Sequence, residues 1–316
     1  MSFVRYNTED SVISAETVVR GLWSGDNNTL TNFSTASGYS EYYLDVNNIS
    51  SPVSTQFNIQ YGNLNGSGSS AINPNVIGYT PSKVVYGQYR NLVYGTETTN
   101  FSFDANGTVV NDIFVINITR ARYKESLVPG SFNLRLTSGS TVFNLTDDSG
   151  TTNLTRFIGE NRYFNIISGS NGNYYTSGTP SEIMGLFFPD LNIVILNPSS
   201  SISSSIPPAT ANNNHVRLYT SITSGGFFTL QSSETISSRY FFTRVKNGDF
   251  NYTTNPSIID ENGNILYTTL INNPQTFITT VGMYNDNNEL LAVAKLSKPL
   301  VKDFTKEALV RIKLDY

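Results

Sequence analysis

The chain of 316 residues contains no cysteine and a single histidine, His215. Without cysteine it can form neither a disulfide nor a thiolate metal site. One imidazole cannot build a multi-histidine metal site, and His215 ends a run of asparagines that predicts a flexible loop. No Gly-x-Ser-x-Gly motif supports a nucleophile. We therefore expect no catalytic residue, no metal site and no cofactor.

Charge is also scarce, since charged residues make up 14% of the chain, against about a quarter in typical soluble proteins. The net charge is −4 and no basic stripe is present, so nucleic acid is not an expected partner. No apolar run approaches the roughly 18 residues of a membrane span, and the first residues lack the apolar segment of a signal peptide. A membrane partner is therefore not expected either.

Three weaker chemical signals remain. The segment Gly62–Ala71 is rich in glycine but has no Gly-Lys-Ser/Thr, so a surface loop is favoured over a phosphate site. Asn285–Glu289 offers oxygen atoms without calcium-loop spacing and predicts a turn. Glycoside cleavage needs only two nearby carboxylates, and the chain has 24 acids. It shows no internal repeat of a β-helical chain, so we expect a protein that is not an enzyme.

What the chain does contain favours strands and turns: Asn, Ser, Thr, Gly, 19 Tyr and 19 Phe. The clearest strand is the last one. Its apolar positions are Val310, Ile312, Leu314 and Tyr316, and its polar positions are Arg311, Lys313 and Asp315. This alternation predicts a strand with one buried face. We expect it to pair with a hairpin over Thr276–Ser297 that turns at Asn285–Asn288.

Further strands are indicated by alternating or dense apolar runs. They are predicted at 57–61, 113–118, 132–136, 142–145, 163–167, 183–196 with a turn at Pro189, 216–219, 226–230 and 239–245. Two helices are expected. The first covers 8–23, and the second covers 81–93 with Thr80 as its cap and Pro81 in its first turn.

Two sets of residues have both a structural and a binding interpretation. Trp23, the only tryptophan, either anchors its segment to the core or contacts a neighbouring subunit. Arg120, Arg122 and Lys124 would share one face of a strand. That face is either solvated or pairs with acidic residues of another subunit.

These patterns predict a mainly β protein with sandwich-like antiparallel sheets, two short helices and long polar loops. The expected organisation is an N-terminal region at 1–196, a Ser/Pro-rich loop or linker at 197–214, and a C-terminal region at 215–316, although one elaborate domain is also compatible. Within the linker, 199–213 is expected to be exposed and dispensable for folding, because its composition buries little apolar area.

Five stretches resemble virion structural proteins of contractile-tailed marine phages, notably phages of cyanobacteria. They are Val281–Ser297, Tyr61–Ser69, Thr80–Arg90, Arg120–Gly130 and Gly185–Asp190. The first is similar to the hairpin at the baseplate-attaching ends of tail-fibre proteins. The group has no defining catalytic motif, so the resemblance implies a setting, the virion, and no chemistry.

The function expected from this resemblance is a tail or baseplate protein that assembles through contacts with other virion proteins and with further copies of itself. Two alternatives stay open. One is a head decoration or neck protein. The other is a receptor- or carbohydrate-binding module that stacks exposed aromatic rings on sugars.

Overall fold

A computed structural model describes residues 7–35, 42–49, 52–69, 81–152, 154–175, 182–209, 214–253 and 255–315. The protein is mainly β with antiparallel sheets, as expected. Its chain forms two units. Unit 1 comprises Met1–Glu16 and Thr235–Tyr316, and unit 2 comprises Thr17–Glu234. The chain passes from one unit to the other twice, each time within a strand: β1 (Ser11–Gly21) and β16 (Gln231–Val245).

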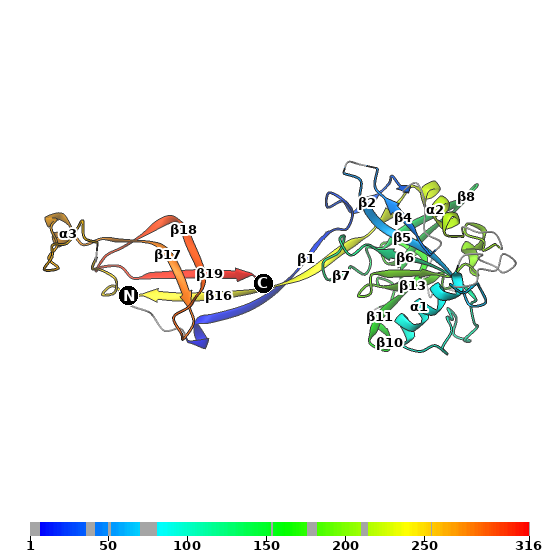
Figure 1. Cartoon of the computed structure of the whole chain (residues 1–316), viewed down its shortest axis with the longest axis horizontal. Coiled ribbons are helices and arrows are strands. Elements are labelled where there is room, and N and C mark those ends of the chain that lie inside the picture. Colours follow the sequence, from blue (N-terminus) through cyan, green and yellow to red (C-terminus); the bar gives the residue numbers. More distant parts are fainter. Residues whose placement is uncertain are drawn as a thin grey trace. The chain divides into compact units, whose positions relative to one another are not determined.

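Unit 2 is built on a curled sheet of thirteen described strands (Figure 1). Its main path is β2 (Thr29–Leu30), β15 (Phe228–Thr229), β8 (Asn133–Ser138), β9 (Thr141–Asp147), β11 (Asn161–Ser170), β13 (Gly185–Phe188), β14 (Ile193–Leu196), β6 (Asp112–Ile118), β5 (Thr55–Asn63), β4 (Leu44–Asn47) and β3 (Ser34–Thr35). The short strands β10 (Arg156–Ile158) and β12 (Asn173–Tyr174) pair with β11, and β7 (Ser126–Leu127) pairs with β16. The predicted strands at 57–61, 113–118, 142–145 and 163–167 all occur.

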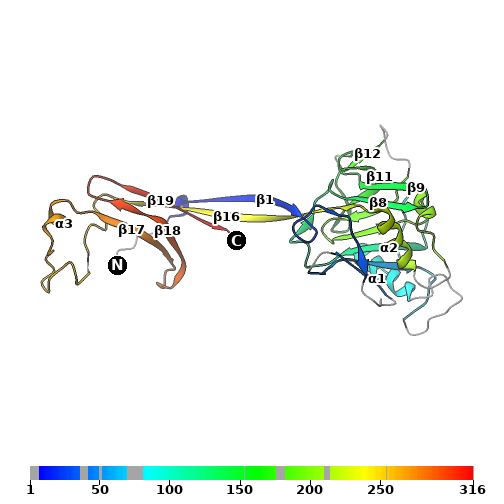
Figure 2. The same cartoon turned by 90° about the horizontal axis from the view of Figure 1, so that it is seen from above.

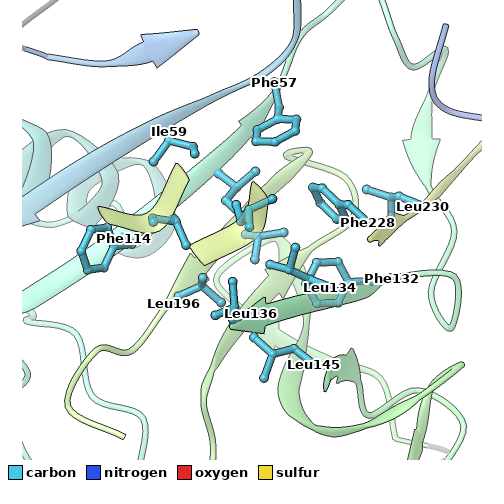
Figure 3. Packing of buried hydrophobic residues seen from close by; sticks show 14 of the residues in the cluster. Phe57, Ile59, Phe114, Phe132, Leu134, Leu136, Leu145, Leu196, Phe228 and Leu230 are labelled. Atoms are coloured by element: carbon cyan, nitrogen blue, oxygen red, sulfur yellow. The ribbon is translucent and has the colours of Figure 1, made fainter. Parts of the chain in front are cut away.

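Alternation along these strands produces two hydrophobic cores. In β6, Phe114, Ile116 and Ile118 belong to a first core cluster, whereas Ile113 and Val115 belong to a second. Because successive side chains of a strand point to opposite faces, the sheet is apolar on both. Figure 3 shows the first cluster, in which residues from β5, β6, β8, β9, β14 and β15 converge. Burial of this extent explains how unit 2 is stabilised without disulfides.

Helix α1 (Ser82–Tyr94), cyan in Figure 1, packs on β5 and contributes Val85, Tyr86, Tyr89 and Val93 to the second cluster. The predicted helix at 81–93 is thus confirmed, while Thr80 lies outside the described residues. A Cβ at Gly62 would lie 2.8 Å from the Tyr86 backbone nitrogen, so the strand needs glycine where the helix crosses it. Helix α2 (Asn214–Gly225) instead contributes Leu218 and Ile222 to the first cluster.

Two helix predictions were wrong. Only Thr8–Asp10 of the expected helix at 8–23 is helical, as the 3₁₀ turn η1, and β1 follows it. The β-branched residues Val12, Ile13, Thr17, Val18 and Val19 favour an extended backbone, and this preference outweighs the acidic start. The strand expected at 216–219 is part of α2.

The Ser/Pro-rich segment 197–214 does not divide the chain, since both of its described parts belong to unit 2. The expectation that it is exposed was wrong for part of residues 199–209, of which only Ser199, Ser201, Ser203, Ser204 and Pro207 are exposed. Ile202, in the 3₁₀ helix η2 (Ser201–Ser204), and Ile206 are fully buried in the first core cluster. Two isoleucines spaced by four residues anchor the segment despite its polar composition. Residues 210–213 lie outside the described residues.

Unit 1 holds α3 (Thr268–Asn272) and the hairpin of β17 (Thr276–Tyr284) and β18 (Leu290–Lys302), which run side by side in Figure 2. The hairpin and its turn at Asn285–Asn288 are confirmed, with Asn288 in the left-handed conformation at φ 61°. The terminal strand β19 (Ala308–Asp315) is confirmed as a strand. Its expected buried face was wrong in part, because Val310 is buried and Ile312 half-buried but Leu314 is exposed, and Tyr316 lies outside the described residues. Its expected partner was also wrong, since β19 pairs with β16 and forms no ladder with the hairpin among the described strands.

Candidate functional site

The side chains best suited to catalysis or ligand binding have structural roles in this fold. His215 was expected in a flexible loop but lies buried in the first turn of α2. Burial lowers the pKa of its imidazole to about 4, because removal from water disfavours the charged form. An imidazole that is buried and neutral at pH 7 cannot meet a substrate at the surface.

Asp147 and Asp148 form the best-defined buried acidic site of unit 2. Both Asp147 carboxylate oxygens accept the Gly130 N–H, at 2.9 and 2.8 Å, and burial raises the pKa of Asp147. Asp148 accepts the Asn165 N–H at 3.0 Å and pairs with Arg156 at 2.8 Å. Every carboxylate oxygen is thus engaged with the protein, and the pair holds loops to the sheet.

Two sequence interpretations are settled by burial and by backbone shape. Trp23 anchors its segment, because it is buried between Phe57 and Phe228 and donates its indole N–H to the Phe228 carbonyl at 3.0 Å. The expected basic strand over Arg120, Arg122 and Lys124 was wrong, since these residues lie in a turn after β6. Turn geometry directs Arg120 over the Tyr123 ring, with 4.8 Å between guanidinium carbon and ring centre.

The most unusual surface belongs to unit 1. Of its described residues, the only buried hydrophobic ones are Phe241, Val245, Ala308 and Val310. A much larger set of its hydrophobic side chains is exposed. We call this set the apolar surface of unit 1: Val12, Ile13, Phe250, Tyr252, Leu266, Tyr267, Ile271, Phe277, Tyr284, Leu290, Leu291, Val293, Leu300, Val301, Phe304, Leu309 and Leu314.

Strand register gathers parts of this surface into pairs. Phe277 lies opposite Val301, and Tyr284 lies opposite Leu290, so each pair projects from one face of the hairpin. Each hairpin strand has a single ladder partner among the described strands, and so does β19. Unit 1 therefore combines exposed apolar faces with sheet edges that can accept another strand.

This surface was not predictable from alternation, because alternation shows which residues share a face but not whether another layer covers that face. The available signal was the large number of aromatic residues combined with few charges.

Other functional features are sparse in the described part of the chain. Two hollows occur in unit 2, one of about 260 Å³ beside Tyr94, Phe103 and Arg156, and one of about 460 Å³ beside Tyr43 and Asn117. No three His, Asp or Glu side chains gather there as metal ligands would, and none of the described helices is long and apolar enough to cross a membrane.

Comparison with protein-family models, with curated proteins and with solved structures finds no match for this chain.

Proposed function

We propose that this protein is a structural component of a tailed-phage virion, a tail or baseplate protein that assembles through protein–protein contacts of unit 1. The sequence resemblance is the basis for placing the protein in a virion in this proposal. The apolar surface of unit 1 supports the assembly role, and it is the observation on which the proposal rests. The proposed role is mechanical and requires no catalytic residue, metal or cofactor.

The exposed apolar area of unit 1 is of the size that a standard protein–protein interface needs. An aromatic side chain covers roughly 150–250 Å², so the exposed parts of Tyr252, Tyr267, Phe277 and Phe304, each more than half exposed, together amount to about 400 Å². The aliphatic members more than double this area. A standard interface takes about 800 Å² from each partner. Apolar patches of this size on a soluble protein mark surfaces that a partner covers.

The partner that fits best is another copy of this chain. Unit 1 offers both an apolar face and open strand edges, so strands of one copy can extend or cover the sheets of the next. A two-stranded hairpin such as β17–β18 is marginal on its own, and added layers from identical copies would complete it. Repeated copies are also how most oligomers are built. Other virion proteins would then bind the completed assembly.

Leu309→Asp tests the surface. Leu309 is 67% exposed in unit 1, and the matched control Leu154→Asp changes a leucine that is 66% exposed in unit 2. Both variants should keep the thermal transition of unit 2 followed by circular dichroism, which shows that the larger core is intact. Light scattering after gel filtration should show that wild type and Leu154→Asp form oligomers, and that Leu309→Asp lowers the oligomer fraction at least about ten-fold, which corresponds to about 1.4 kcal/mol. Equal assembly of all three would contradict the role of unit 1.

Analysis of purified virions tests whether the protein is part of the particle. Quantitative mass spectrometry of purified virions should find the protein in several copies, and imaging of labelled particles should place it on the tail or baseplate. A position on the shell or at the neck would favour a head decoration or neck protein instead. Absence from intact particles would overturn the structural proposal.

A further inference from the structure

A row of polar side chains crosses three adjacent strands of unit 2. Asp45 of β4 lies opposite Asn58 of β5, and Asn58 lies opposite Asn117 of β6. Residues opposite one another in antiparallel strands project from the same face. This is the face that carries Ile113 and Val115 of the second core cluster. The apolar face therefore ends in an amide- and carboxylate-lined patch.

This patch forms the floor of the larger hollow. The hollow has a volume of about 460 Å³, which lies within the usual range of about 300–1,000 Å³ for ligand sites. Its other lining residues include Tyr43, Thr119, Arg120 and Tyr123. Tyr43 is 42% exposed. Arg120 is held in place by its stack on Tyr123 and by donating to the Tyr123 carbonyl at 2.8 Å.

Several polar groups around the hollow have unused hydrogen-bonding capacity. Within the described residues, the side chains of Asp45 and Asn117 make no hydrogen bond, and the buried Thr119 hydroxyl has no partner. Asn58 receives one bond, from the Gln60 amide at 3.0 Å, which leaves its own NH₂ free to donate. Partial burial also raises the pKa of Asp45. Asp45, Asn58 and Asn117 are half-buried, so a ligand would replace their hydrogen bonds to water, whereas the Thr119 hydroxyl would gain a partner that it lacks.

The balance of charge and group type selects the ligand. Asp45 and Arg120 contribute one negative and one positive charge, so neither an anion nor a cation is favoured overall. Each asparagine amide can donate and accept, which matches hydroxyl groups that also do both. An exposed tyrosine beside them offers an apolar plane to the C–H face of a ring. A neutral, ring-shaped polyol matches these groups, because its hydroxyls both donate and accept and one face of its ring presents C–H groups.

We propose that this hollow is a binding site for a neutral saccharide, with Tyr43 stacking on the sugar ring and Asp45, Asn58, Asn117 and Arg120 bonding its hydroxyl groups. The volume accommodates one or two sugar units. The site lies entirely in unit 2 and does not depend on the assembly role of unit 1. It adds recognition to a protein whose proposed role is structural.

Saturation-transfer NMR with the full-length protein tests the proposal, because it detects weak ligands of large proteins. The probes are the methyl glycosides of glucose, galactose, mannose and N-acetylglucosamine, with inorganic phosphate as the anionic probe. At least one glycoside should give a saturable signal. Phosphate should neither bind nor compete. A chain that binds no glycoside, or that binds phosphate in preference, would overturn the proposal.

Two variants and one control locate the binding. Tyr43→Ala and Asn117→Ala should each weaken glycoside affinity at least about ten-fold, through loss of stacking and of paired hydrogen bonds. Tyr175→Ala removes an aromatic ring that is 61% exposed and lies outside the hollow, and it should leave the affinity unchanged. Because Tyr43 is at the surface, its variant should stay folded. Retained affinity in Tyr43→Ala, or equal loss in Tyr175→Ala, would place any binding elsewhere.

Discussion

At the scale of single residues, the buried carboxylates Asp147 and Asp148 of unit 2 are fully hydrogen-bonded. Asp147 shows this, since its carboxylate sits at the end of β9 and takes up the N–H of Gly130, a residue in the left-handed conformation at φ 85°. A side-chain acceptor thereby satisfies a backbone donor that no strand reaches. The acidic turn at Asp147–Asp148 thus stabilises a loop, and the sequence could not distinguish this role from a solvated turn.

His215 gives unit 2 a defined pH dependence. Its pKa is about 4 in the folded state against 6.5 for an ordinary histidine. The unfolded chain therefore binds more protons between these values, and the stability present above pH 6.5 is lost as the pH falls through 4. The loss attributable to this residue is up to about 3 kcal/mol.

The variant His215→Gln isolates this effect. Urea unfolding measured near neutral pH and again at about pH 4.5 should show a smaller loss of stability for His215→Gln than for wild type. Asp147 acts in the opposite direction, because its pKa is raised, but its contribution is common to both proteins and cancels. Identical pH profiles for the two proteins would show that His215 is not held neutral by the fold.

At the scale of elements, local periodicity predicted the strands, turns and helices that depend mainly on residues close in sequence. The strand β6, the β13–β14 turn at Pro189 and the β17–β18 hairpin follow from dense or alternating apolar runs between turn residues. Helix α1 follows from its pattern of buried residues, and Gly95 ends it in the left-handed conformation at φ 67°. Each of these elements could therefore be predicted from its own residues.

Elements that depend on distant partners were not predictable in the same way. The row of Asp45, Asn58 and Asn117 exists only through the register of three strands, of which β6 lies far from β4 and β5 in the sequence. In contrast, α2 did carry a signal. Its buried residues Leu218, Ser221, Ile222 and Gly225 follow helical spacing, but a short alternating window within it resembles a strand.

The Ser/Pro-rich segment yields a prediction for an element whose composition is misleading. Ile206 is fully buried in the first core cluster, so Ile206→Ala should destabilise unit 2 by about 2–5 kcal/mol through lost burial and the resulting cavity. Ser203→Ala, an exposed position in η2, should change stability by less than about 0.5 kcal/mol. Thermal unfolding of both variants measures the difference. A segment that tolerates Ile206→Ala as well as Ser203→Ala would be the dispensable linker that its composition suggests.

At the scale of the whole molecule, the two units differ in how their stability arises. Unit 2 contains two hydrophobic cores, one on each face of its sheet, whereas the described residues of unit 1 bury four hydrophobic side chains. A unit of this size normally requires a continuous core to offset the entropy of folding. If unit 1 assembles as proposed, the surface that it buries against a partner supplies stability that its own core does not.

Unfolding of the full-length protein should reveal this difference as two transitions. The transition of unit 1 should shift to higher temperature as protein concentration rises, because association stabilises only the species that associates, while the transition of unit 2 should not move. Calorimetry over about a hundred-fold range of concentration measures both shifts. Hydrogen exchange assigns them, with amides of β6 and β14 expected to exchange last. A single transition that is independent of concentration would show that unit 1 is stable without copies of itself, and its apolar surface would then need a different partner.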